Sequence, residues 1–506
     1  MTAGVPDVGF ILNGSPVTVS TDGRTLLEAL RGLGVRSTKD GCSPQGQCGC
    51  CTVWVDGRPR VACVTPVSRV AGRAITTVEG LADATEWGER LCAAGGSQCG
   101  FCTPGIIMRV AAIEACGRTE AAVRQALLAH LCRCTGWNSI VEAACSPIVG
   151  RSASRDLDAA AVRAALEGGA VQHVGPSVAL GEGGFAADSA PADALVAVRG
   201  ADGEWAVGAT LTAARQASAK VQGRRTTAPL RWPIEVPPGE WARTLQTTWV
   251  EPAYLEPDAA WCEPGGDPVG PLCNGGAFGA KAHSAIGSVA RRLADERGRA
   301  VLAMYSREDS VRLGPKRPPM AAGVRADGTG VVRVARTTGV GAAIRSIAPG
   351  LVVEEVDLLG PPTDVIVRGS GWVEAAVLLA AEDGWITAPS GGRARARFEG
   401  DEIFVSVACG AALDEVVLRS YCIGAAHMAL GWVRHEGVVV DAEGEPQDLT
   451  IRSFGVLRAV DMPMVHVDIA PSTDTPVNGS DAVFAAVALA AWRASGFAPR
   501  WPTMRT

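Results

Sequence analysis

Hydrophobic and polar residues alternate in several short stretches of the first 78 residues, as they do in strands with one buried face. Asn-Gly-Ser-Pro at 13–16 and Asp56-Gly57 separate such stretches and predict hairpin turns. Residues 25–33 follow the helical period instead, ending at Gly34. The predicted strands are 8–12, 17–20, 52–55, 60–64 and 75–78. This order predicts a small mixed sheet around one helix.

The hydrophobic period becomes helical after residue 78. The predicted helices are 81–93, 105–116, 119–130 and 138–144. Two cysteine pairs fall in the turns between them, so this part is expected to be a small helical bundle around a metal centre.

The rest of the chain gives weaker signals. Residues 151–235 are rich in Ala, Gly and Pro and predict a linker with irregular strands, whereas 236–506 mix strands and helices in an α+β pattern. In that part the predicted strands are 331–336, 402–407 and 437–440, and the predicted helices are 283–295, 413–432 and 480–494. The expected fold class is α+β, divided into 1–78, 79–150, 151–235 and 236–506.

Composition narrows the function classes. The 506 residues are 47% hydrophobic and 20% charged, which allows sizeable buried cores. A net charge of -6, with few Tyr and Phe, argues against a nucleic-acid partner. With no apolar run long enough to span a bilayer and no signal peptide at the N-terminus, we expect a cytoplasmic protein without a membrane partner. Twelve of the 16 cysteines precede residue 150, which favours metal binding over disulfides.

The first cysteine group lies in a glycine-rich loop and the segment that follows it. Its proposed ligands are Cys42, Cys48, Cys51 and Cys63. Four thiolates suit a [2Fe–2S] cluster, and the loop glycines allow the backbone to fold around it. This order is characteristic of plant-type ferredoxin loops; a zinc site or buried free thiols are the alternatives. Cys50 is expected to pack away from the cluster.

The second group combines a C-x-x-C and a C-x-C motif. Its proposed ligands are Cys99, Cys102, Cys132 and Cys134. Alone, C-x-x-C also fits a redox dithiol or half a zinc site; paired with C-x-C after a ferredoxin-like loop, it predicts a second [2Fe–2S] cluster.

The strings 98–105 (QCGFCTPG) and 131–136 (LCRCTG) resemble the iron–sulfur domains of the xanthine dehydrogenase/aldehyde oxidase family of molybdenum hydroxylases. The resemblance covers residues 8–145 and implies a β-grasp ferredoxin domain followed by a helical [2Fe–2S] domain. It also implies that Gln98 hydrogen-bonds a molybdopterin. The first loop departs slightly, with five residues between Cys42 and Cys48 where four are usual.

A thinner resemblance continues to the C-terminus. Residues 274–281 (NGGAFGAK) resemble the family's glycine-rich molybdopterin segment, and 368–374 (RGSGWVE) resemble its R-x-x-G-x-x-E segment. The strings 250–257, 306–309 and 316–318 flank them in the family's order. The implied cofactor-binding residues are Gly275, Gly276, Phe278, Gly279, Arg368 and Gly371.

The departures concern the catalytic centre. The pterin-like region is about half the family's length, and only 17 residues separate Pro257 from Gly275. The family's catalytic Glu lies in a G-E pair before the last helix, where this chain has 472–481 (STDTPVNGSD) and no Glu. Asp474 and Asp481 are weak candidates for a substitute base, because Asp481 begins a helix that Ser480 is expected to cap.

Three functions remain open at this stage. The first is an iron–sulfur electron-transfer subunit of a molybdenum hydroxylase complex, passing electrons from molybdopterin on a full-length molybdenum subunit to FAD on a flavin subunit. Its pterin-like half would then be a scaffold. The second is a compact, self-contained hydroxylase of an aldehyde or N-heterocycle, and the third a non-catalytic assembly protein.

Overall fold

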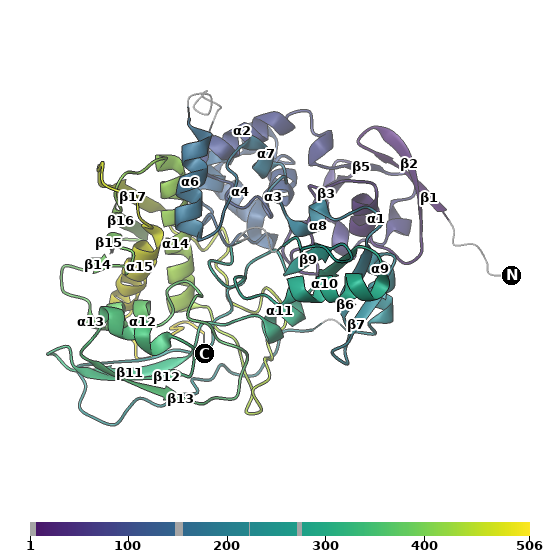
Figure 1. The fold of residues 1–506 in the computed structure, drawn as a ribbon. Coiled ribbons are helices and arrows are strands. Elements are labelled where there is room, and N and C mark those ends of the chain that lie inside the picture. Colours follow the sequence, from purple (N-terminus) through teal and green to yellow (C-terminus); the bar gives the residue numbers. More distant parts are fainter. Residues whose placement is uncertain (1–6, 147–154, 222, 271–275, 506) are drawn as a thin grey trace.

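The computed structural model describes the chain except residues 1–6, 147–154, 222, 271–275 and 506 (Figure 1). The first part is a five-stranded sheet, ordered β2-β1-β5-β3-β4, that packs on one helix. Its elements are β1 (Asp7–Leu12), β2 (Ser15–Ser20), α1 (Leu26–Gly32), β3 (Thr52–Val55), β4 (Arg58–Val61) and β5 (Ala74–Thr76). The two predicted hairpins form as expected, since β1 pairs with β2 and β3 with β4, both antiparallel.

The predicted strand 60–64 is shorter than expected. β4 ends at Val61, and Ala62–Val64 form a 3₁₀ turn that carries Cys63. The turn withdraws Cys63 from the strand ladder, so its side chain is free to face the glycine-rich loop, and Cys63 is buried.

Four helices form the second part, as the periodicity predicts. They are α2 (Ala84–Ala94), α3 (Thr103–Val110), α4 (Glu120–Ala126) and α5 (Asn138–Cys145). The helices α3 and α4 end earlier than predicted; α4 continues only as a 3₁₀ turn to Ala129. The loops before α3 and after this 3₁₀ turn carry the four cysteines of the second group.

The segment 151–235 is more ordered than the expected linker with irregular strands. It contains α6 (Leu157–Gly168), α7 (Pro176–Ala179), α8 (Ala186–Ser189), β6 (Leu195–Arg199), β7 (Trp205–Gly208) and α9 (Leu211–Ala217). Asp156 caps α6 and Gly169 ends it with φ 70°, which are ordinary helix boundary signals. Because β6 pairs with β10, this segment shares a sheet with the C-terminal half.

Three four-stranded sheets and the longest helices form the remainder (Figure 1). The sheets are ordered β7-β6-β10-β9, β13-β12-β11-β8 and β14-β15-β16-β17. Their further strands are β8 (Arg243–Gln246), β9 (Ala259–Cys262), β10 (Val301–Met304), β11 (Met320–Val324), β12 (Gly330–Ala335), β13 (Leu351–Val356), β14 (Ile386–Thr387), β15 (Arg393–Glu399), β16 (Glu402–Ala408) and β17 (Val465–Ile469). The helices are α10 (Ile286–Arg297), α11 (Arg307–Leu313), α12 (Val340–Ile347), α13 (Trp372–Leu379), α14 (Glu415–Arg434) and α15 (Ser480–Ala494). This mixture confirms the α+β class.

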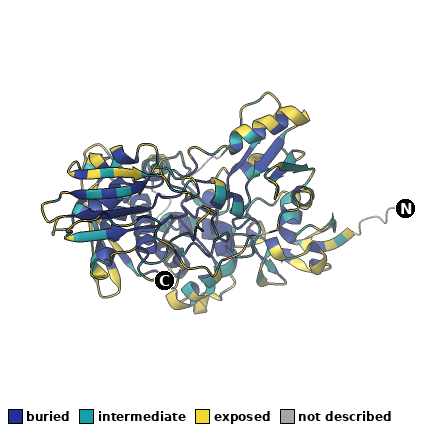
Figure 2. Ribbon diagram, turned by 90° about the horizontal axis from the view of Figure 1, so that it is seen from below, coloured by how far each residue is buried: buried dark blue, intermediate teal, exposed yellow. Residues whose placement is uncertain are grey.

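The core centres on α14 and α15, which pack against each other and against α6 and β15. Buried residues fill the interior of the protein, and exposed residues lie at its periphery (Figure 2). By length and composition α14 alone, among the described residues, could cross a membrane, but 89% of its apolar window is buried in the protein. Two predictions here are wrong: 437–440 make only an isolated bridge from Val440 to Pro446, and α15 is preceded by Gly479 rather than capped by Ser480. The Asn478 side chain instead accepts from the Asp481 N–H.

A buried histidine makes this core sensitive to acid. His427 on α14 is fully buried, its Nε2 lies 3.0 Å from the Leu457 carbonyl, and burial lowers its pKa to about 4. An unfolded chain has a histidine pKa near 6.5. Between pH 6.5 and pH 4 the unfolded chain therefore gains a proton that the folded chain does not, which favours unfolding.

We expect His427→Gln, which keeps a donor for Leu457, to lose less stability on acidification. Between pH 7 and pH 4.5 its free energy of unfolding should fall about 2 kcal/mol less than that of the wild type. Urea unfolding followed by tryptophan fluorescence measures the difference, and identical pH profiles for the two proteins would contradict it.

Candidate iron–sulfur centres

The first thiol group forms where the glycine-rich loop meets the turn after β4. Cys42, Cys48, Cys51 and Cys63 are all buried. Backbone N–H groups of Gln45 and Gln47 point at the Cys42 sulfur, 3.1 and 3.4 Å away. The Cys48 and Cys63 thiols and these N–H groups hold the pKa of Cys42 well below its usual range. The loop thus favours a thiolate, which is the metal-binding form.

The glycines of the first cysteine-bearing loop allow neighbouring side chains to approach its backbone closely. A Cβ on Gly41 would lie 3.0 Å from the Cys48 sulfur, and Gly49 has φ 78° with the ring of His130 in the place of its Cβ. His130 therefore packs directly on the first loop. Cys50 is buried, its backbone lies against Gly105 and its thiol contacts the thiol of Cys48, so the expectation that Cys50 packs away from the first group is wrong.

The second group forms at the N-terminal end of α3 and in the loop before α5. Cys99, Cys102, Cys132 and Cys134 are buried, and the Cys99 and Cys134 sulfurs are 3.6 Å apart. The Cys102 thiol and the Thr135 hydroxyl lower the pKa of Cys132 to about 7. Within the described residues no three potential ligands surround a single ion position. The thiols meet in pairs instead, Cys99 with Cys134 and Cys102 with Cys132.

Such pairs fit a two-iron cluster, in which each iron takes two protein thiolates. Two thiolates on one tetrahedral metal at about 2.3 Å are themselves about 3.7 Å apart. The separation of 3.6 Å between Cys99 and Cys134 matches this value. Both groups therefore suit [2Fe–2S] clusters.

The two thiol groups lie next to each other. The Leu131 N–H, one residue before Cys132, donates to the Cys48 carbonyl at 3.0 Å. Thr52 and His130 are also in contact, 3.2 Å apart. A single hydrogen bond therefore joins the backbones of the two cysteine-bearing loops.

The second group is covered by the C-terminal half of the same chain. A Cβ on Gly424 of α14 would lie 1.8 Å from the Cys134 carbonyl. Arg133 makes a buried two-point ion pair with Glu436, at 2.6 and 2.8 Å. The Gln98 amide, which the family resemblance assigns to a pterin, donates instead to the Cys134 carbonyl and the Ser420 hydroxyl.

The residues that the family resemblance assigns to the pterin come together, but their own atoms fill the space between them. A Cβ on Gly276 would lie 3.3 Å from the Cys134 sulfur, and Gly279, with φ 97°, packs on the Ile366 carbonyl. The Arg368 guanidinium lies over the Phe278 ring, 4.1 Å from its centre. Gly371 begins the turn into α13 with φ 86°. Gly275 lies outside the described residues.

The candidate base positions are separated. Asp474 is exposed and bonded to Ser472, away from the pterin-like residues, whereas Asp481 lies 3.3 Å from Arg368. Arg368 also donates to the Ser480 hydroxyl at 2.9 Å. Sequence reasoning missed the carboxylate of Glu167, which accepts from the N–H groups of Gly479 and Ser480 at the start of α15. The cap at Asp156 could have predicted the helix that carries Glu167, but not its partners, which lie more than 300 residues away.

A molybdopterin does not fit among these residues. The cavity bounded by Arg133, Arg368, Met428 and Phe484 has a volume of about 20 Å³, and the one beside Gln98 about 10 Å³. Each holds a water molecule or two, whereas small-ligand sites measure about 300–1,000 Å³. The two cavities at these described residues are therefore too small for the cofactor.

The family-like strings instead pair with one another. Lys316 lies 2.8 Å from Glu251, and Arg317 makes a two-point contact with Glu374 at 2.7 and 2.8 Å. All four side chains are buried. Each of these charges is therefore paired with an opposite charge within the protein.

Family models match both cysteine-bearing parts. Residues 10–68 match a 2Fe-2S iron-sulfur cluster binding domain, and residues 77–145 match a [2Fe-2S] binding domain. Together with the paired thiols, these matches define an iron–sulfur protein with two [2Fe–2S] clusters.

Curated relatives identify the family. The chain is 39% identical over 138 residues to the xanthine dehydrogenase iron-sulfur-binding subunit of Escherichia coli O157:H7, covering 86% of that protein. It is 42% identical over 154 residues to a xanthine dehydrogenase of Emericella nidulans, covering 11% of that longer protein. The chain belongs to the xanthine dehydrogenase/aldehyde oxidase family of molybdenum hydroxylases.

The whole fold also has solved counterparts. The aldehyde oxidoreductase of Desulfovibrio gigas matches with a TM-score of 0.73 over 99% of each chain at 14% identity. That of Desulfovibrio desulfuricans matches with a TM-score of 0.67, over 96% of this chain and 97% of that one, at 13% identity. The C-terminal half therefore shares its fold with these proteins.

Gly424 tests the contact between α14 and the second thiol group. An alanine in a helix is ordinarily more stable than glycine, but here its methyl group would enter the Cys134 carbonyl. We expect Gly424→Ala to destabilise the protein by about 1–3 kcal/mol and to reduce selectively the electron paramagnetic resonance signal of one cluster. Gly287→Ala on α10, whose Cβ meets nothing closer than 3.4 Å, is the control. Equal signals in both variants would contradict the contact.

Proposed function

We propose that this chain is the iron–sulfur electron-transfer component of a xanthine dehydrogenase/aldehyde oxidase-type molybdenum hydroxylase complex. Its ligands would be Cys42, Cys48, Cys51 and Cys63 for one cluster and Cys99, Cys102, Cys132 and Cys134 for the other. The observation that carries the proposal is the hydrogen bond from Leu131 to Cys48, which holds the two thiol groups side by side.

The chain's residues fit this role. When bound, [2Fe–2S] clusters supply one-electron redox chemistry. The buried thiol groups exclude water, and the N–H groups aimed at Cys42 stabilise its negative charge. Electrons from a full-length molybdenum subunit would cross from the second group to the first and leave for FAD on a flavin subunit.

The first thiol group offers electrons a way to leave for a partner subunit. Residues 44–47 of its loop are half-buried, and Val64, next to Cys63, is 51% exposed. An exposed valine beside a redox centre is a reasonable contact for a flavin-binding partner.

A self-contained hydroxylase of an aldehyde or N-heterocycle is the weaker candidate. It would need a molybdopterin beside Gln98 and Arg368, where the cavities measure about 10 and 20 Å³. The substitute carboxylates are also poorly suited, because Asp474 is exposed and Asp481 is paired with Arg368. A pure scaffold would not need two adjacent thiol groups.

The proposal is tested by purifying the tagged chain from its native host. We expect a stoichiometric complex with separate flavin and molybdenum subunits, in which substrate reduces both clusters faster than the complex turns over. A chain that purifies alone, or whose clusters substrate leaves oxidised within the complex, would contradict an electron-transfer role.

Val64→Asp tests whether electrons leave the first thiol group through the surface around Val64. A charge in the contact should slow reduction of the flavin about tenfold, since burying an unpaired charge at an interface costs more than 1.4 kcal/mol. Iron content should stay unchanged, because Val64 is exposed. Val162→Asp on α6, equally exposed at 54%, is the matched control. Stopped-flow absorbance of the complex measures the rate, and equal rates in the two variants would refute this exit.

A further inference from the structure

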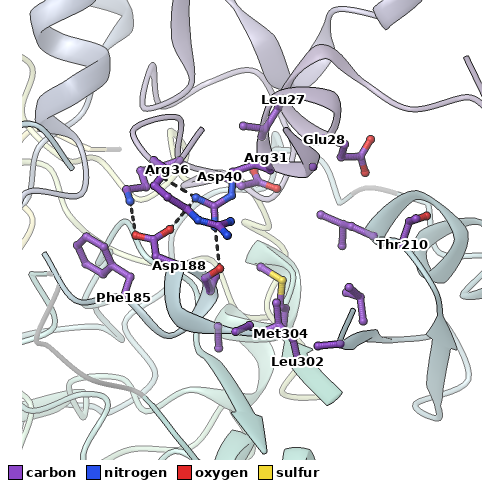
Figure 3. A pocket seen from close by; sticks show the side chains of 18 of the residues that line it. Leu27, Glu28, Arg31, Arg36, Asp40, Phe185, Asp188, Thr210, Leu302 and Met304 are labelled. Carbon is purple, nitrogen blue, oxygen red and sulfur yellow. Dashed lines mark hydrogen bonds and ion pairs between the residues drawn. The ribbon is translucent and has the colours of Figure 1, made fainter. Parts of the chain in front are cut away.

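A cavity that the proposed function does not use lies between α1 and the sheet that contains β6, β9 and β10 (Figure 3). It has a volume of about 360 Å³, within the range of small-molecule sites. Gly276, Phe278, Gly279, Arg368 and Gly371 do not line it. Its position and lining therefore need a separate explanation.

Part of the cavity lining is apolar and aromatic. Leu27 on α1 and, across from it, Leu302 and Met304 on β10 line the cavity (Figure 3). Phe101 and Phe185 also line it, and their rings meet edge to face at 5.0 Å. Phe101 lies between Cys99 and Cys102, so an occupant would touch the loop that carries the second thiol group. Aromatic rings on the wall favour an aromatic occupant.

Positive charge lies beside these residues, with the Lys39 ammonium 5.0 Å from the centre of the Phe185 ring. Arg31 and Lys39 share the single carboxylate of Asp188, with Arg31 2.6 Å from it (Figure 3). No ion pair engages the half-buried Arg36 anywhere in the described chain. The residues that line the cavity, taken together with their ion-pair partners, include six cationic and five acidic side chains. They are Arg24, Arg31, Arg36, Lys39, Arg215 and Lys281 against Asp22, Glu28, Asp40, Asp188 and Glu256.

The acidic residues that line the cavity are already engaged. Arg215 lies 2.8 Å from Asp40 and 3.5 Å from Glu28, and Lys281 pairs with Glu256. An anionic ligand would therefore meet the surplus cation rather than a free carboxylate. We propose that this cavity binds a small aromatic acid, with its ring against Phe101 and Phe185 and its carboxylate at Arg36.

Calorimetry of the intact, cluster-loaded chain tests the proposal with two probes of equal size. Naphthalene-2-carboxylate should bind once per chain, about tenfold more tightly than neutral naphthalen-2-ylmethanol, because a hydrogen bond to a charged group is worth about one decade or more. Arg36→Gln should weaken the carboxylate about tenfold and leave the alcohol unchanged. Arg58→Gln, an exposed arginine on β4 without an ion pair in the described chain, should change neither.

Val196→Trp, which places a large side chain in the cavity, should abolish binding of both probes. The visible absorbance of the clusters confirms that each variant is folded. If the wild type binds neither probe, the site is overturned; if both probes bind equally and Arg36→Gln has no effect, the anion specificity is overturned. Either result leaves the proposed electron transfer untouched, because that role is measured by cluster reduction.

Discussion

The buried ion pair of Arg133 and Glu436 is the interaction on which the arrangement of this chain depends. Arg133 lies between two cysteines of the second thiol group, and Glu436 follows α14. The guanidinium also donates from Nε to the Pro252 carbonyl at 2.8 Å, so all three of its nitrogens donate hydrogen bonds. Removing either partner would leave a buried charge, which costs several kcal/mol, about 3–5 in comparable cases. The thiol group and the C-terminal half are therefore one structural unit.

The packing of the second thiol group against the C-terminal half also closes the site that the family resemblance assigns to the pterin. α14 lies against Cys134 through Gly424, the glycine string lies against its sulfur through Gly276, and Glu167 of α6 occupies the N-terminal end of α15. A carboxylate is favoured there because unpaired N–H groups and the helix dipole are positive. The family's cofactor-binding pattern persists in the sequence as a network of internal contacts.

Much of the iron–sulfur part was predictable from local signals. Hairpin turns, the helical period after residue 78 and the spacing of eight cysteines needed no long-range information. The linker prediction failed at α6, although Asp156 and Gly169 carried its boundary signals, because its alanine-rich face looked weak in isolation. The role of Glu167 was out of reach, since its partners at 479–480 are more than 300 residues away in sequence. Similarly, a family motif identifies Gln98 and Arg368, but it does not reveal whether neighbouring protein atoms fill the space between them.

The central claim is that the chain holds two [2Fe–2S] clusters and no molybdopterin. Metal and pterin analysis of the purified chain, separated from any partners, tests it most directly. The account predicts about four iron atoms per chain, two for each cluster, with neither molybdenum nor pterin. One molybdenum and one pterin per chain would contradict it, because the packing around Arg368 and Gly276 leaves no room for them.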